Sequence, residues 1–192
     1  MAAPQRLAPP MTVEEYLAFE EASSDARHEY VDGYVYAMTG GSLRHNKIAG
    51  NIYRRLSQAA EGGPCQVFVN DVKVRVGRSK FYYPDVVVVC GPVDMDGVYV
   101  RNPCLIVEVL SPSTRAVDQR EKLAAYRTLD SLAAYLMVEQ SERVVEWHYR
   151  DGSPGGWGLG VCAAGAAGTR VPIPCPEVAL TLDEIYEGTG VD

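Results

Sequence analysis

The sequence has little positive charge for its length. Its 192 residues include 18 Lys and Arg against 25 Asp and Glu, which gives a formal net charge of −7. Nucleic-acid binding depends on basic contacts with phosphate, so this balance argues against a generic polyanion binder. The charge is also uneven, because residues 44–80 hold eight basic and two acidic residues, whereas residues 130–192 hold three and ten. The basic segment is either a contact surface for an anion or an ordinary solvated face.

The sequence also lacks any uninterrupted apolar run long enough to span a bilayer. Residues 1–10 are rich in proline and have no apolar centre of the kind found in signal peptides. We therefore expect residues 1–10 to be a mobile tail and the protein to be cytoplasmic, with no membrane partner. The length predicts a single domain over residues 11–192.

Cysteine is sparse, and no pair has the C-x-x-C spacing of common metal sites. The odd number of cysteines, their wide spacing and their apolar surroundings predict buried reduced thiols rather than a zinc site. The five residues are Cys65, Cys90, Cys104, Cys162 and Cys175.

Turn and capping signals divide the first third of the chain. Asp32-Gly33 is the strongest hairpin signal and lies between two short strands within residues 27–38. Thr12 and Glu15 have the spacing of a capping box, which predicts a short helix through Phe19. Ser42 is suited to cap a helix over residues 43–60 with one apolar stripe.

Apolar runs and helical periodicity continue through the rest of the chain. They predict a mixed sheet with helices packed against it, a fold of the α/β (mixed α+β) class that begins with the N-terminal hairpin. The predicted strands cover residues 66–76, 81–90, 104–110, 133–140, 143–150 and 157–163. A further helix covers residues 115–129, and a turn or short helix covers residues 182–187.

Two acidic residues interrupt strands that are otherwise apolar. Asp85 precedes Val86-Val87-Val88-Val89, and Glu108 lies within the run Leu105 to Leu110. A buried carboxylate without a partner costs several kcal/mol or loses its charge. A divalent cation held by oxygen ligands from neighbouring strands explains both residues at once, although a turn-capping Asp and a structurally paired Glu are the alternatives.

Helical spacing predicts that Lys122 faces the sheet. It shares one helix face with Asp118, Ala125, Tyr126 and Leu129, so its ammonium needs a carboxylate partner such as Glu108 or Asp85. Two carboxylates, a cation and an ammonium suit phosphodiester hydrolysis, because the metal lowers the pKa of water and the cations offset charge on phosphorus.

Three stretches form a recognisable set: Tyr83-Pro84-Asp85, the run Val107 to Thr114, and Asp118 with Glu121-Lys122. Together they resemble the Uma-two family, restriction-endonuclease-like proteins of the PD-(D/E)xK nuclease superfamily. The most specific is Glu-Val-Leu-Ser-Pro-Ser-Thr at residues 108–114, and the resemblance extends from Met11 to Ile185. It implies a central mixed sheet flanked by helices and DNA cleavage that depends on Mg²⁺ or Mn²⁺.

The resemblance also implies roles for individual residues. Asp85 matches the aspartate of the PD half-motif, and Glu108 matches the acid of the second half. The superfamily lysine would fall at Leu110, so Lys122 is the residue expected to supply it from the next helix. Glu29 would be a third acidic ligand, and His45 a further polar group beside the site.

Two alternatives to a DNA endonuclease remain open. One is a binding or scaffold domain that keeps the fold without turnover, which the net charge and Leu110 favour. The other is a metal-dependent hydrolase of a nucleotide or a sugar. For the nuclease, the expected partner is double-stranded DNA, and a homodimer would frame a duplex better than one acidic domain.

Overall fold

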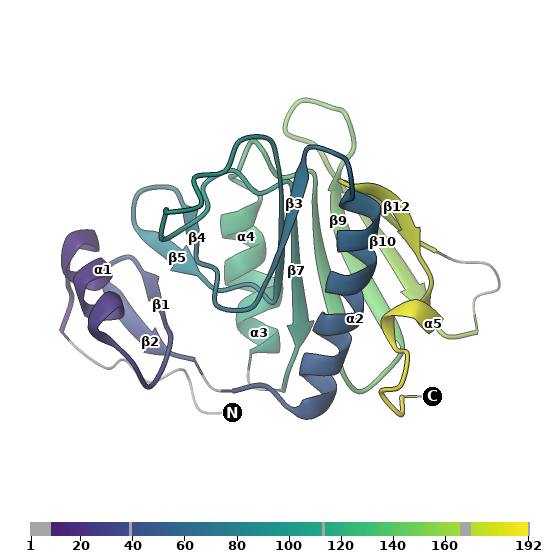
Figure 1. Ribbon diagram of the computed structural model, residues 1–192, viewed down its shortest axis with the longest axis horizontal. Coiled ribbons are helices and arrows are strands. Elements are labelled where there is room, and N and C mark those ends of the chain that lie inside the picture. The colour runs from purple at the N-terminus through teal and green to yellow at the C-terminus, as the bar shows by residue number, and fades with distance from the viewer. Residues whose placement is uncertain (1–8, 39, 113, 166–169, 192) are drawn as a thin grey trace.

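The computed structural model of the protein describes residues 9–38, 40–112, 114–165 and 170–191. The predicted tail therefore lies almost entirely outside the described residues. A six-stranded sheet of order β10-β9-β8-β7-β6-β3 forms the centre (Figure 1), and its β7–β8 pair is parallel whereas its other pairs are antiparallel. Its strands are β3 (Cys65–Val69), β6 (Val86–Cys90), β7 (Leu105–Leu110), β8 (Ala134–Glu139), β9 (Val144–Arg150) and β10 (Trp157–Ala163).

Two smaller sheets lie beside the central sheet. A four-stranded sheet of order β2-β1-β5-β4 contains the N-terminal hairpin, and a two-stranded sheet pairs β11 with β12. The strands are β1 (His28–Val31), β2 (Tyr34–Ala37), β4 (Val74–Val76), β5 (Lys80–Tyr82), β11 (Val171–Pro174) and β12 (Glu177–Leu180).

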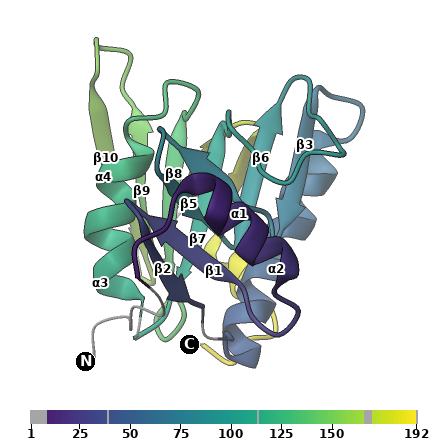
Figure 2. The ribbon, with the colours of Figure 1, turned by 90° about the vertical axis from the view of Figure 1, so that its left-hand side faces the viewer.

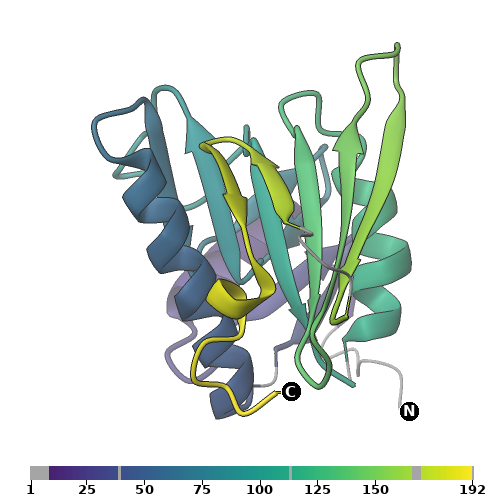
Figure 3. The same cartoon turned by 90° about the vertical axis from the view of Figure 1, so that its right-hand side faces the viewer.

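Helices and small sheets cover both faces of the central sheet. In Figure 3, α2 and the β11–β12 pair lie in front of one face, and the helix that begins with α3 lies at the far side. The helices are α1 (Val13–Ala22), α2 (Leu43–Ala60), α3 (Arg115–Val117), the π-helical η1 (Asp118–Lys122), α4 (Leu123–Tyr126) and α5 (Leu182–Ile185). These three consecutive segments, α3, η1 and α4, form one continuous helix.

Successive side chains along the buried strands point to opposite faces of the central sheet, so each face has its own hydrophobic core. Val107 and Val109 of β7 pack in the core that α2 covers, whereas Ile106 and Leu110 pack in the core that α4 covers. Glu108 has the parity of the second set. The strand pattern therefore directs its carboxylate into the α4 side of the sheet.

A third, aromatic core holds the N-terminal elements together. Tyr16 of α1 stacks on Tyr30 of β1 with ring centroids 4.8 Å apart, and Phe81 of β5 completes the cluster. Figure 2 shows α1 lying across the β1–β2 hairpin. The hairpin, the Thr12–Glu15 capping box and the Ser42 cap are confirmed as predicted.

The prediction of single strands over residues 66–76 and 81–90 is wrong. The chain leaves the central sheet after β3, and Asn70 and Asp71 take left-handed backbone angles with φ of 51° and 50°. It re-enters through Tyr83 and Pro84, between β5 and β6. Each predicted strand is thus divided between two sheets, because the turn residues interrupt the apolar run.

The prediction of reduced, buried cysteines is also wrong for four of the five. Cys65 is bonded to Cys90 and Cys104 to Cys175, and Cys90 is exposed. These pairs depend on strand register, since Cys65 lies directly opposite Cys90 across β3 and β6. The β11–β12 hairpin that carries Cys175 was not predicted. Among the described residues, no helix is both long and apolar enough to cross a membrane.

Candidate active site

Strand register brings the two unusual acids to the same end of β6 and β7. The antiparallel pair matches Val86 with Val107, so Asp85, one residue before β6, falls opposite Glu108. Glu108 is buried, whereas Asp85 is partly open to solvent, with about 15% of its side chain exposed. The pair therefore combines a buried carboxylate with one that solvent partly reaches.

Lys122 is the hydrogen-bond partner of Glu108. Its ammonium donates to Oε1 of Glu108 at 3.0 Å, and the hydroxyl of Tyr126 donates to the same oxygen at 3.1 Å. All three side chains are buried. Because both bonds go to Oε1, they leave Oε2 of Glu108 for a further ligand.

Three carboxylates surround the Lys122 ammonium. Its Nζ lies 2.8 Å from Glu29 Oε1 and 3.1 Å from Asp118 Oδ1, in addition to Glu108. Asp118 and Lys122 are the first and last residues of the π-helical segment, and both are buried. The Asp118 contact is an ion pair without hydrogen-bond geometry, so Oδ1 of Asp118 is a buried acceptor without a hydrogen bond.

The N-terminal hairpin supplies Glu29 from a fixed register. β1 pairs with β5 through Tyr30 and Phe81, and the backbone N–H of Tyr83 donates to Glu29 Oε1 at 3.4 Å. A buried Glu20 anchors the same region, because it accepts from the Tyr83 hydroxyl at 2.7 Å and contacts the ring of His28. Packing of α1 thus contributes to the position of Glu29.

Asp85 is oriented by two groups from different elements. Its Oδ1 lies 2.8 Å from Nε2 of His45, and its Oδ2 accepts the backbone N–H of Val109 at 2.7 Å. His45 reaches this point because Ser42 caps α2 and accepts the backbone N–H of His45. The imidazole therefore joins the first turn of α2 to the start of β6.

Burial and crowding of acids shape the electrostatics. Burial raises the pKa of Glu108 well above its ordinary value, and Asp118, Asp85 and Glu29 add to this effect while Lys122 opposes it. For Lys122, burial acts to lower the pKa, but the facing carboxylates outweigh it and raise the pKa well above the ordinary value. The ammonium stays charged, and the site favours an additional positive charge.

The donor set suits a hard divalent cation. Four carboxylates, from Glu29, Asp85, Glu108 and Asp118, share one ammonium and one imidazole. Oxygen donors of this kind are the ligands that Mg²⁺ and Mn²⁺ prefer. The four carboxylates outnumber the ammonium and the imidazole, and this surplus of negative charge fits a bound cation.

The His45–Asp85 contact predicts a pH-dependent contribution to stability. Burial lowers the pKa of His45, but the hydrogen bond and charge of Asp85, with Asp118, outweigh it and raise the pKa above 6.5. The folded state then binds the proton more tightly than the unfolded state. This contribution is complete below the unfolded pKa and is lost as pH rises through the folded pKa. The stability that wild type gains over His45→Gln should therefore shrink as pH rises, in denaturant titrations with EDTA.

His148→Gln is the matched control, because burial lowers the pKa of His148 below 6.5. Because the pKa shift of His148 is opposite to that of His45, the stability that wild type gains over His148→Gln should shrink as pH falls. Parallel pH profiles for the two variants would contradict the assignment of His45.

The structure brings all five predicted site residues into one neighbourhood. Glu29, Glu108 and Lys122 are in direct contact, and Asp85 and His45 form an adjoining pair. Their chemical roles stay predictions. The contact of Tyr126 with Glu108 was not predicted, although its spacing of four residues from Lys122 placed it on the same helix face.

Known proteins match this chain over most of its length. The family model Uma2, described as "Putative restriction endonuclease", matches residues 13–182. Two uncharacterized proteins of Synechocystis sp. are each 33% identical: slr1290, over 94% of this chain and 93% of its own, and sll1609, over 73% and 80%. A crystal structure from Anabaena variabilis, a "putative nuclease belonging to DUF820", has a TM-score of 0.76 at 16% identity and covers 94% of this chain and 99% of its own. That likeness shows a shared fold.

Proposed function

Because this chain belongs to the Uma2 family, described as "Putative restriction endonuclease", we propose that its buried carboxylate–lysine cluster hydrolyses DNA phosphodiester bonds with a divalent cation. The observation that carries the proposal is the excess of carboxylates around one ammonium, next to an Asp85 that solvent partly reaches. A purely structural ion pair needs one acid for one base, and additional buried acids only raise its cost.

Asp85 and Glu108, with Glu29, would hold Mg²⁺ or Mn²⁺. When bound, such an ion lowers the pKa of a water molecule and offsets charge that develops on the phosphate. The Lys122 ammonium, kept charged by its acidic neighbours, would orient the attacking water and stabilise the phosphorane-like transition state. His45 and the Val109 N–H orient Asp85, so that its carboxylate does not need to reorganise during the reaction.

Basic residues of α2 could contact a nucleic acid. Arg44 and Lys47 are exposed on its first turns, and Arg44 donates through Nε to the carbonyl oxygen of Thr189 at 3.2 Å. Contacts from such residues to phosphate would offset the acidity of the whole chain locally. A double-stranded substrate and a homodimer around it stay predictions.

Nicking of supercoiled plasmid DNA in Mn²⁺ tests the proposal. We expect wild type to nick the plasmid and EDTA to abolish the activity. Asp85→Ala should lose at least about tenfold of the rate, because it removes one proposed ligand. The exposed Asp130 offers the matched control, and Asp130→Ala should retain the wild-type rate. Equal nicking by wild type and Asp85→Ala would refute the assignment.

A non-catalytic scaffold is the second candidate. Leu110 stands at the usual lysine position, and the Lys122 ammonium already partly neutralises the carboxylates, which favours a site that needs no metal. Calorimetric titration with Mn²⁺ separates the two functions, because the scaffold predicts a folded protein that takes up no metal ion at these acids.

A further inference from the structure

Four cysteines from distant parts of the chain meet at the end of the central sheet away from the carboxylates. Cys65 begins β3, Cys90 ends β6, Cys104 immediately precedes β7, and Cys175 lies between β11 and β12. Asp85 comes just before β6, whereas Cys90 is its last residue. In β7, Cys104 comes just before the strand, whereas Glu108 lies in its second half. The cysteine cluster is thus a second site, and its properties do not depend on the proposed nuclease function.

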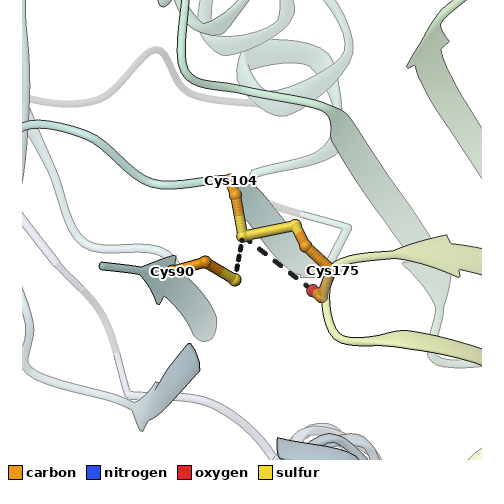
Figure 4. Close-up of side chains that lie close together, drawn as sticks. All are labelled: Cys90, Cys104 and Cys175. Atoms are coloured by element: carbon orange, nitrogen blue, oxygen red, sulfur yellow. Dashed lines mark hydrogen bonds between the residues drawn. A yellow bond between two sulfur atoms is a disulfide. The ribbon is translucent and has the colours of Figure 1, made fainter. Parts of the chain in front are cut away.

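The two disulfides are near each other in space. Sγ of Cys90 lies 3.3 Å from Sγ of Cys104, although each is bonded to a different partner. Figure 4 shows Cys90, Cys104 and Cys175 converging, and their sulfur atoms all lie within 4.8 Å of one another. Since Cys65 is bonded to Cys90, all four sulfurs belong to one cluster.

This arrangement matches what a tetrathiolate metal site requires. Zn²⁺ binds four cysteine sulfurs tetrahedrally at about 2.3 Å, which places the sulfurs roughly 3.8 Å apart. Three of the sulfurs lie within 4.8 Å of one another, and the fourth, of Cys65, is bonded to one of these three, so only small shifts after reduction would bring them to such separations. The cluster is only partly buried, so an ion can enter from solvent.

We propose that the reduced form of this cluster binds one Zn²⁺ ion through Cys65, Cys90, Cys104 and Cys175. Reduction by a low-molecular-weight thiol supplies two electrons and two protons to each disulfide, breaks both S–S bonds and leaves four thiols. Binding of Zn²⁺ then releases four protons and forms four Zn–S bonds, so the site carries a net charge of −2. Reducing compartments keep such thiols reduced, which makes the metal form the one expected there.

The metal form would connect elements that the disulfides link only in pairs. One disulfide joins β3 to β6, and the other joins the start of β7 to the β11–β12 hairpin. A single ion would tie all of these elements at one point. Binding to the folded state alone would stabilise the reduced protein.

Titration of the full chain with Co²⁺, after reduction with a phosphine under anaerobic conditions, tests the proposal. We expect the intense thiolate-to-cobalt absorption of a tetrahedral site at one equivalent, and its loss when Zn²⁺ is added. Cys175→Ser should weaken Co²⁺ binding at least about tenfold. Cys162→Ala, which alters the buried cysteine of β10 outside both disulfides, should bind as wild type does.

Asp85→Ala should keep the same absorption, because carboxylate-bound Co²⁺ gives no thiolate band. This variant separates failure of the cysteine site from failure of the nuclease proposal. If Cys175→Ser does not fold, X-ray absorption of zinc-loaded wild type decides, with four sulfur neighbours expected. Nitrogen or oxygen neighbours, or reduced and folded wild type without the thiolate band, would overturn the proposal.

Discussion

Glu108→Gln should reduce Mn²⁺-dependent DNA nicking by about 10²–10³-fold while the melting temperature stays the same or rises. The amide removes a proposed metal ligand and a negative charge. It also removes an unfavourable electrostatic contribution to folding, because burial and three neighbouring acids penalise the ionised form of Glu108. Lys122 keeps two carboxylate partners, Glu29 and Asp118. Plasmid nicking and thermal unfolding of the same preparation measure the two effects.

Opposite changes in activity and stability distinguish a functional acid from a structural one. If Glu108 only served an internal ion pair, Glu108→Gln would lower stability and leave any nicking unchanged. Glu121→Gln is the matched control, since Glu121 lies on the same helix as Lys122 but contacts Tyr82 and Lys80 instead. That control should nick at the wild-type rate.

Lys122→Met should lower the free energy of unfolding by about 3–5 kcal/mol in the absence of metal. The substitution retains the volume of the side chain but leaves Glu29, Glu108 and Asp118 buried without their shared cation. Burial raises the pKa of Glu108 well above its ordinary value, and protonation of Glu108 should therefore diminish this loss of stability as pH falls. Mn²⁺ should recover part of the loss, and chemical denaturation at several pH values measures both effects.

Lys47→Met provides the comparison, because Lys47 is exposed on α2 and its removal should change stability by no more than about 0.5 kcal/mol. If the loss of stability in Lys122→Met did not depend on pH or on Mn²⁺, Lys122 would contribute to stability through packing alone. Loss of nicking together with rescue of stability by Mn²⁺ would place the ammonium in the reaction.

Local signals predicted the elements around the site well. The Asp32-Gly33 turn, the Thr12–Glu15 capping box and the Ser42 cap each depend on residues close in sequence, and all three are present. The helical position of Lys122 also followed from spacing alone. Its contact with Glu108 confirms the predicted direction of the side chain.

Features set by long-range pairing were not predictable in the same way. Residues 66–76 and 81–90 read as continuous strands because apolar residues run through them, yet the chain changes sheets within each segment. The disulfides depend on the β3–β6 register and on the unpredicted β11–β12 hairpin. Contact between His45 and Asp85, 40 residues apart, likewise depends on how α2 crosses the sheet.

The π-helical segment between α3 and α4 lets one helix both present polar side chains and pack apolar side chains in the core. A π turn contains more residues than an α turn, so it behaves as a local insertion that the flanking turns absorb. Asp118 and Lys122 are presented from this segment, while Ala125 and Tyr126 keep the α-helical spacing that fills the core. A polar side chain can therefore be introduced or moved within this segment without redesigning the hydrophobic interface on which the helix depends.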